Sequence, residues 1–401
     1  MIKIAVMGYG TIGSGVSKTL EMNKEIITNN VGEEVSLKYV LDLRDFPGDP
    51  IEDKVVHDVN VIANDPEVSI VVETMGGTKP AYEFVKMMLE SGKSVVTSNK
   101  ALVAAHGTEL LEIAASKKKN FLFGASVGGG IPIIRPLRTS LAQDELQEIT
   151  GILNGTTNYI LTKMKDEGLS YEVALSQAQA LGYAEKDPTA DVEGYDSCRK
   201  IAILSSLAYE KEANYEDIHT EGITKITNID FQYANKAGMA VKLLATSRRV
   251  GDKFYAVVAP TMVDATCPLY SVSDVFNAVL VKGNIVGDLM FYGSGAGSLP
   301  TAAAVVADVI EVAKHPHCSV MRIWSREKLE FSDYKELESR FFVRFEGKSN
   351  KNAVIELLEP TKAYELEGMD EYGVVTKKMS QNAFEEALKK LDGVISVLRV
   401  H

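Results

Sequence analysis

The chain has few of the features that mark secreted, membrane-spanning or nucleic-acid-binding proteins. Its three scattered cysteines make no disulfide framework, so we expect a reducing, cytoplasmic environment. No apolar run approaches the length of a membrane span, and the start MIKIAVMGYG lacks the basic region and cleavage site of a signal peptide. The formal net charge of -12 argues against nucleic acid or an anionic membrane surface as a partner.

The rest of the composition is that of a globular protein. The 401 residues are 45% hydrophobic and 24% charged, enough for two or three domains with their own cores. Over residues 1–130, short apolar runs alternate with helical segments. This alternation predicts right-handed βαβ units, and therefore an α/β fold with a Rossmann-type doubly wound parallel sheet.

The pattern changes twice further along the chain. Strands with period-two character and several helices predict an α+β substrate domain over residues 131–299. A small, apolar helix within residues 300–320 is expected to pack back onto the first domain and complete it. After a linker around residues 325–339, short strands and helices alternate again, which predicts a small α+β domain over residues 338–401.

The first predicted strand ends in GYGTIG, a GxGxxG motif that opens a helix. Gly8 permits the tight turn, Gly10 lets the backbone approach a pyrophosphate, and Gly13 allows close helix packing. The helix N-terminus supplies N–H groups and a positive dipole end for a phosphate. We therefore predict a dinucleotide site made by Gly8, Gly10, Thr11, Ile12 and Gly13, in preference to a glycine-rich turn without a ligand.

Three further residues are candidates for the same site. Asp42 ends the second predicted strand and suits a ribose 2′-hydroxyl, which favours NAD. Arg44 could accept a 2′-phosphate, so NADP remains open. Lys100 stands where a strand gives way to a helix, the side of a doubly wound sheet that faces the ligand. The alternative for Lys100 is an ordinary surface charge.

Residues 182–200 carry five carboxylates in nineteen positions, GYAEKDPTADVEGYDSCRK. A calcium-binding EF-hand loop needs glycine at its sixth position and glutamate at its twelfth. Counting from Asp187 gives Val192 and Cys198 instead, which excludes that interpretation.

Asp196 and Lys200 in this stretch are four residues apart and share one face of a predicted helix. An exposed salt bridge is one interpretation of the pair. Apolar residues continue near that face, which favours a pair that points inward. A buried lysine suits proton transfer, and carboxylates suit the ammonium group of a substrate.

With these motifs in order, the chain resembles homoserine dehydrogenase over essentially its whole length. The resemblance is carried by MGYGTIGSGV, VVETMGG, VTSNKALVAAHG, GGGIPIIRPL, GILNGTTNYILTKM, GYAEKDPTADVEGYDSCRK and GSGAGSLPTAAAVVADV. It implies an NAD(P)-dependent oxidoreductase that interconverts L-homoserine and L-aspartate 4-semialdehyde in threonine, methionine and isoleucine biosynthesis. No aspartate kinase domain precedes the first strand, so the resemblance is to the monofunctional form. It also implies a homodimer or higher homo-oligomer that assembles through the middle domain.

The resemblance assigns roles residue by residue. Lys200 matches the general acid/base, and Lys100 the second active-site lysine near the nicotinamide. Glu185 and Asp196 match the carboxylates that bind the substrate. The remaining acids of the stretch then belong to the turn and the helix start: Asp187, Asp191 and Glu193. The glycines that match the lining of the cofactor crevice are Gly182 and Gly297.

One departure concerns a monovalent cation, sodium or another, that is structural in the family. Its ligands there include a glutamate side chain, at a position that is Gly124 in this chain. The backbone carbonyls that match the other ligands belong to Val127, Gly129 and Ile131. The cation site is therefore expected to lack its carboxylate.

A second departure concerns the tail, which resembles an ACT-type module that in relatives can bind threonine. Such modules usually carry a proline-glycine turn after the first strand. Here the turn reads EGKSNKNAV, with Ala353 near the expected glycine. Because a Cβ disfavours positive φ, we predict a structural or dimer-forming tail more than a tight threonine sensor.

Two other functions stay open at this point. One is a related dehydrogenase that acts on another amino-acid semialdehyde. The other is a non-catalytic amino-acid sensor that keeps a vestigial nucleotide fold. A measurement of cofactor reduction on addition of L-homoserine distinguishes a homoserine dehydrogenase from these two alternatives.

Overall fold

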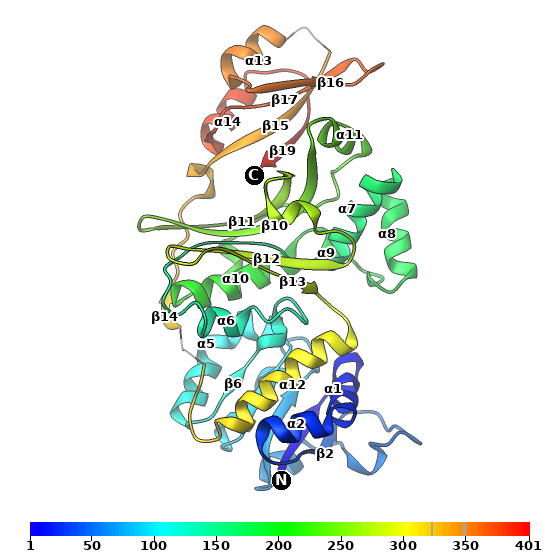
Figure 1. The fold of residues 1–401 in the computed structure, drawn as a ribbon, viewed down its shortest axis with the longest axis vertical. Coiled ribbons are helices and arrows are strands. Elements are labelled where there is room, and N and C mark those ends of the chain that lie inside the picture. Colours follow the sequence, from blue (N-terminus) through cyan, green and yellow to red (C-terminus); the bar gives the residue numbers. More distant parts are fainter. Residues whose placement is uncertain (322–323, 348–349) are drawn as a thin grey trace. The chain divides into compact units, whose positions relative to one another are not determined.

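The computed structural model describes residues 1–321, 324–347 and 350–401, so residues 348–349 of the predicted tail turn lie outside it. The chain forms two compact units, each described here by itself (Figure 1). Unit 1 comprises residues 1–144, 202–214 and 293–329, and unit 2 comprises residues 145–201, 215–292 and 330–401. The domain limits expected from the sequence stay predictions.

Unit 1 is built on a six-stranded parallel sheet in the order β3-β2-β1-β4-β5-β6. Its strands are β1 (Ile2–Met7), β2 (Val35–Leu41), β3 (Val55–Val56), β4 (Val68–Glu73), β5 (Ser94–Thr97) and β6 (Phe121–Leu122). Strand order reverses between β1 and β4, which is where doubly wound sheets bind their ligands. The predicted Rossmann-type sheet is confirmed.

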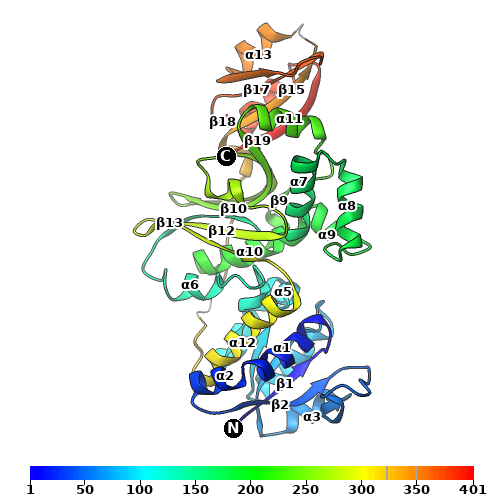
Figure 2. The same ribbon diagram turned by 45° about the vertical axis from the view of Figure 1, so that its right-hand side comes forward.

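Unit 1 also contains helices, as the alternation of apolar runs and helical segments predicts. They are α1 (Thr11–Met22), α2 (Lys24–Val31), α3 (Val59–Asn64), α4 (Ala81–Glu90), α5 (Lys100–Ser116), α6 (Ile134–Arg138) and α12 (Ser298–Lys314). The helix expected near residue 300 is α12, which packs against α1 (Figure 2). Small buried residues on α12, among them Ala302 and Val305, allow this close approach.

One segment of unit 1 differs from expectation. The presumed linker contains strand β14 (Ser325–Lys328), which pairs in parallel with β8 (Lys211–Glu212). Its side chains are exposed, so it has the polar composition of a linker although it is hydrogen-bonded.

Unit 2 contains a mixed sheet of eleven strands, nine of them in the order β13-β12-β7-β10-β11-β19-β15-β17-β16, with β9 on β11 and β18 on β15. The strands are β7 (Leu146–Ile152), β9 (His219–Thr220), β10 (Met239–Val250), β11 (Lys253–Asp264), β12 (Phe276–Gly283), β13 (Gly287–Ser294), β15 (Glu338–Glu346), β16 (Lys362–Glu365), β17 (Glu371–Val375), β18 (Met379–Ser380) and β19 (Val394–Val400). The period-two pattern does not predict β10, because its first seven residues are buried on both faces and do not alternate.

The helices of unit 2 flank this sheet. They are α7 (Gly155–Glu167), α8 (Tyr171–Ala180), α9 (Thr189–Val192), α10 (Tyr195–Tyr209), α11 (Asn228–Lys236), α13 (Lys351–Leu358) and α14 (Gln381–Leu388); the last residues of α10 belong to unit 1. No helix in the described part of the chain is long and apolar enough to cross a membrane.

The tail joins the sheet of unit 2 through its last strand. Strand β19 pairs in parallel with β11 and antiparallel with β15 (Figure 1). The tail itself runs β15-α13-β16-β17-α14-β19, the order of a ferredoxin-like unit. Aromatic side chains of β15, Phe341 and Phe345, pack in the core between the tail's sheet and its helices.

Candidate active site

The glycine-rich turn after β1 has the geometry that its motif predicts. Gly8 adopts a φ of +94°, and its N–H donates to the carbonyl of Leu41 at 2.8 Å. A Cβ on Gly13 would lie 2.0 Å from the carbonyl oxygen of Gly8, so only glycine fits there. A Cβ on Gly10 would meet no protein atom within 4 Å. The space in front of Gly10 is therefore open, as a pyrophosphate on the N-terminus of α1 requires.

Asp42 and Arg44 form one charged group at the end of β2. The Arg44 guanidinium donates to both oxygens of Asp42, at 2.9 and 3.0 Å, and to the carbonyl of Tyr9 at 3.2 Å. The N–H of Tyr9 donates to Asp42 Oδ2 at 2.8 Å. The Arg44 guanidinium holds the pKa of the Asp42 carboxyl well below its usual range. A carboxylate and an exposed guanidinium thus both stand where a cofactor ribose is expected.

Gly297 lies next to the same turn. It precedes α12, has a φ of +119°, and is followed by Ser298, whose hydroxyl donates to the carbonyl of Thr11 at 2.7 Å. A Cβ on Gly15 would come within 2.7 Å of the Ser298 hydroxyl, which shows how closely α1 and α12 approach. Gly297 is therefore placed beside the predicted cofactor turn.

Lys200 and Asp196 form the expected i, i+4 pair on α10, and the pair is buried. Lys200 Nζ lies 2.7 Å from Asp196 Oδ2 and 2.7 Å from the carbonyl oxygen of Leu153. The exposed fractions of Lys200 and Asp196 are 8% and 3%. An exposed salt bridge is thereby excluded. The ammonium group is held by two acceptors in a setting of low dielectric constant, where charges act more strongly than in water.

Asn154 and Asp191 join this pair, although sequence reasoning did not place them in the site. The side-chain amide of Asn154 donates to Asp191 at 2.7 Å and to Asp196 at 2.9 Å. Its oxygen caps α7 by accepting from the N–H of Thr157. Asn154 therefore connects α7, α9 and α10. The only feature of the sequence that could have indicated Asn154 is its position, as a polar residue between a buried strand and a helix start.

Of the other acids of the stretch, Glu185 and Asp187 are exposed, whereas Glu193 is half-buried. Asp187 accepts from the N–H and hydroxyl of Thr189 at 3.1 and 2.6 Å, as a turn carboxylate does. Glu185 is exposed, and its carbonyl accepts from Gln179. Gly182 is also exposed, with a φ of +75°. Helix α10 begins at Tyr195, because a positive φ at Gly194 separates it from α9.

Lys100 is the first residue of α5 in unit 1, whereas Lys200 belongs to unit 2. Asn99 caps α5, because its side-chain oxygen accepts from the N–H of Leu102 at 3.1 Å. Lys100 thus stands at the carboxyl edge of the parallel sheet, as expected.

The loop that carries Val127, Gly129 and Ile131 lies in unit 1, and Gly124 just before it contacts a buried carboxylate, Asp308 of α12. Asp308 accepts from the N–H of Gly124 at 2.7 Å, and a Cβ on Gly124 would come within 2.8 Å of it.

Arg135 places a guanidinium 3.7 Å from this carboxylate. The carbonyl of Ile131 already accepts from the N–H of Ile133 at 2.8 Å. A cation site with a side-chain ligand from position 124 does not fit these residues. Arginine supplies the positive charge beside Asp308 instead.

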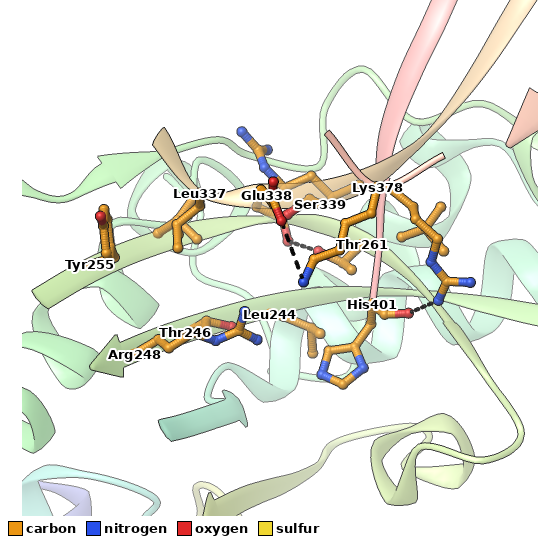
Figure 3. A pocket seen from close by; sticks show the side chains of 15 residues that line it. Leu244, Thr246, Arg248, Tyr255, Thr261, Leu337, Glu338, Ser339, Lys378 and His401 are labelled. Atoms are coloured by element: carbon orange, nitrogen blue, oxygen red, sulfur yellow. Dashed lines mark hydrogen bonds and ion pairs between the residues drawn. The ribbon is translucent and has the colours of Figure 1, made fainter. Parts of the chain in front are cut away.

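A pocket of about 310 Å³ lies in unit 2 on the face of β10 and β11, where the start of β15 and the C-terminal His401 border it (Figure 3). Figure 3 shows Lys378 directed at Glu338, with the two charged groups 3.9 Å apart. The arginines that line the pocket also have acceptors within the chain: Arg248 with Glu148, Arg399 with Glu221, and Arg340 with the His401 carbonyl. Because these charges are already matched, we assign no ligand to the pocket.

The parallel sheet and the open glycine-rich turn of unit 1 are those of a dinucleotide-binding enzyme, and unit 2 holds a buried lysine–carboxylate pair suited to proton transfer. Comparison with known proteins identifies the family of this enzyme. Residues 8–124 match the family described as "Homoserine dehydrogenase, NAD binding domain", and residues 132–310 match "Homoserine dehydrogenase". The chain belongs to the homoserine dehydrogenase family.

Individual relatives agree with this assignment. The chain is 42% identical to homoserine dehydrogenase of Bacillus subtilis over 80% of its own length and 74% of the relative's. It is 35% identical to that of Pseudomonas aeruginosa, covering 99% and 96%. A crystal structure of a homoserine dehydrogenase from Thiobacillus denitrificans matches with a TM-score of 0.92 at 33% identity, covering 100% and 98%. A hyperthermophilic archaeal homoserine dehydrogenase in complex with NADPH matches with a TM-score of 0.66 at 26% identity, covering 78% and 97%.

Proposed function

We propose that the chain interconverts L-homoserine and L-aspartate 4-semialdehyde with a nicotinamide cofactor, and that Lys200 is its general acid/base. The observation that carries the proposal is the buried ammonium of Lys200, fixed at 2.7 Å by Asp196 and by the Leu153 carbonyl. When bound, the nicotinamide accepts or donates the hydride at the carbinol carbon of the substrate.

In the reducing direction, negative charge grows on the aldehyde oxygen of the substrate. An oriented lysine ammonium stabilises that charge and then donates a proton. Asp196 holds the Lys200 side chain in place through the hydrogen bond at 2.7 Å. Lys100 adds a second positive charge near the nicotinamide. Glu185 and Asp196 bind the substrate ammonium, and Asp191, joined to the buried Asp196 through Asn154, is a further carboxylate beside this pair.

Gly8, Gly10 and Gly13 would hold the pyrophosphate, and we favour NAD over NADP. Asp42 offers a carboxylate to the ribose hydroxyls and repels a 2′-phosphate. Arg44 is engaged by that carboxylate through two hydrogen bonds, so it is less available to a phosphate. The residues around Gly124 do not fit the monovalent cation of the family, and we include no cation in the proposal.

We further propose that the tail is structural more than a tight threonine sensor, in a homo-oligomeric enzyme. Its support is the buried ion pair of Arg344 and Asp230, which joins β15 to α11 of the same unit. Inhibition by threonine at sub-millimolar concentration would overturn this part.

The function is tested by following the nicotinamide absorbance after L-homoserine is added to enzyme and NAD or NADP. Reduction with L-homoserine and not with other amino-acid alcohols supports the proposal. Reduction only with another alcohol indicates a related dehydrogenase, and binding of an amino acid without reduction indicates a sensor.

A further inference from the structure

A carboxylate without an assigned role is buried at the carboxyl edge of the parallel sheet. Glu73, the last residue of β4, is 0% exposed. Its Oε1 accepts from the N–H groups of Met75 at 2.8 Å and Gly76 at 3.3 Å, and its Oε2 accepts from the hydroxyl of Thr97 at 2.5 Å. One side chain therefore fixes the turn after β4 and the end of β5 together.

The network continues from Thr97 to the start of α5. The Thr97 hydroxyl accepts from the N–H of Asn99 at 2.9 Å. The Asn99 amide donates to the carbonyl of Gly77 at 2.6 Å, and its oxygen caps α5. The next residue is Lys100. Its backbone position thus depends on hydrogen bonds that begin at Glu73.

The same turn also contacts the glycine-rich turn. The hydroxyl of Thr74 donates to the carbonyl of Gly8 at 2.8 Å, and its N–H donates to the carbonyl of Met7 at 2.9 Å. A Cβ on Gly8 would lie 3.0 Å from the nearest atoms of Met75, so the glycine leaves just enough room for this residue. Hydrogen bonds, together with the peptide links Thr74–Met75 and Asn99–Lys100, therefore connect the cofactor turn through Glu73 to the backbone of Lys100.

The sheet itself does not require this arrangement. Glu73 and Thr97 are already register partners in the parallel ladder of β4 and β5. Burial raises the pKa of the Glu73 carboxyl, so keeping it charged in the interior is unfavourable for folding. All members of the network lie at the carboxyl edge, where sheets of this kind bind their ligands.

We propose that Glu73 is a positioning residue for the dehydrogenase reaction: with Thr97 and Asn99, it sets Lys100 relative to the glycine-rich cofactor turn. This inference rests on the proposed function, in which Lys100 acts near the nicotinamide. A residue that merely stabilises the fold would change stability and leave turnover by the folded enzyme unchanged.

The chain offers a matched control at the opposite edge of the sheet. Lys93, just before β5, is 4% exposed and donates to the carbonyls of Asp65 and Val68 at 2.6 and 3.0 Å. Lys93→Met removes a buried charged group from the same strand region without touching the carboxyl edge. It should lower the stability of unit 1, followed by the fluorescence of the single tryptophan, Trp324, and leave kcat unchanged.

The test compares Thr97→Val, which deletes the hydroxyl at similar volume, with Thr97→Ser, which retains it. We expect Thr97→Val to lower kcat roughly 10- to 100-fold, with a much smaller change in KM for L-homoserine. Thr97→Ser should stay within about threefold of the unsubstituted chain, since the hydrogen bond to Glu73 persists. A Thr97→Val enzyme with unchanged kcat, measured well below its unfolding temperature, overturns the proposal.

A double-substitution cycle with Lys100→Ala separates this inference from the proposed function. Lys100→Ala alone tests the role of Lys100, and an unchanged kcat would refute that role. If Lys100→Ala is impaired, adding Thr97→Val should cost less than about threefold more, because the residue that it positions is already gone. Effects that multiply in full would show that the Thr97 hydroxyl, and with it the hydrogen bond to Glu73, acts independently of Lys100, and would overturn the positioning role alone.

Discussion

Replacing Arg344 by methionine should destabilise unit 2 by about 3–5 kcal/mol. Arg344 of β15 is 2% exposed, and its guanidinium donates to Asp230 of α11 at 2.8 Å and to Glu371 of β17 at 2.8 and 3.1 Å. The substitution leaves two carboxylates without their shared cation. Urea unfolding followed by far-UV circular dichroism measures the loss.

Adding a second substitution, Glu371→Met, should change the stability in the opposite direction, which can be checked. In Arg344→Met combined with Glu371→Met, Asp230 keeps its donors from Ser396 at 2.7 Å and from the N–H and hydroxyl of Thr227 at 2.9 and 2.8 Å. The double variant should therefore be more stable than Arg344→Met alone, because one unpaired buried carboxylate has been removed.

The matched control is Lys253→Met, which breaks the ion pair between Lys253 and Glu336. These two side chains are 58% and 44% exposed, so the loss of stability should be far smaller than in Arg344→Met. A loss of less than about 1 kcal/mol in Arg344→Met contradicts the reasoning. So does a double variant that is less stable than the single one.

Three further results are expected. Gly13→Ala should lower the midpoint of thermal unfolding, because its Cβ would lie 2.0 Å from a main-chain oxygen. Gly10→Ala should leave this midpoint unchanged and weaken cofactor binding measured by calorimetry. Equal midpoints for the two variants would argue against the turn geometry. Asp42→Ala should shift the ratio of kcat/KM values toward NADP and Arg44→Ala toward NAD, and an unchanged ratio would remove both residues from cofactor selection. Burial raises the pKa of Asp308 from 3.8 to about 6, so the folded state binds the proton more tightly and stability falls as pH rises between these values, by at most about 3 kcal/mol. Asp308→Asn should therefore gain stability relative to the unsubstituted chain from pH 4 to pH 6.5, and a difference that does not vary with pH would refute this.

Local patterns predicted the architecture of unit 1 well. Strands β1, β4, β5 and β6 are short, mostly buried runs that end near a glycine or a helix start, whereas β2 and β3 are partly exposed. The same reasoning failed for β10, because the charged residue Lys242 interrupts its buried apolar run. It also gave no indication that β19 would join β11, because the pairing of distant strands has no local signal.

The candidate site likewise contains residues that could be predicted from the sequence and residues that could not. The inward-facing pair of Asp196 and Lys200 could be predicted, since four-residue spacing on a helix is a local property. Asn154 could not, because it reaches its carboxylate partners across 37 and 42 residues of chain. The hydroxyl that Glu73 binds is likewise 24 residues away, and only the folded sheet brings the two together.

The central claim is that Lys200 moves the proton in the oxidation of L-homoserine. The most direct measurement is kcat of Lys200→Met with L-homoserine and NAD(P), beside its cofactor dissociation constant. Lys163→Met, which removes a lysine of α7 paired with Glu167, is the control and should keep normal turnover. We predict that Lys200→Met loses roughly 100- to 10,000-fold in kcat while cofactor affinity stays within about twofold. Turnover within about threefold of the unsubstituted enzyme would contradict the account.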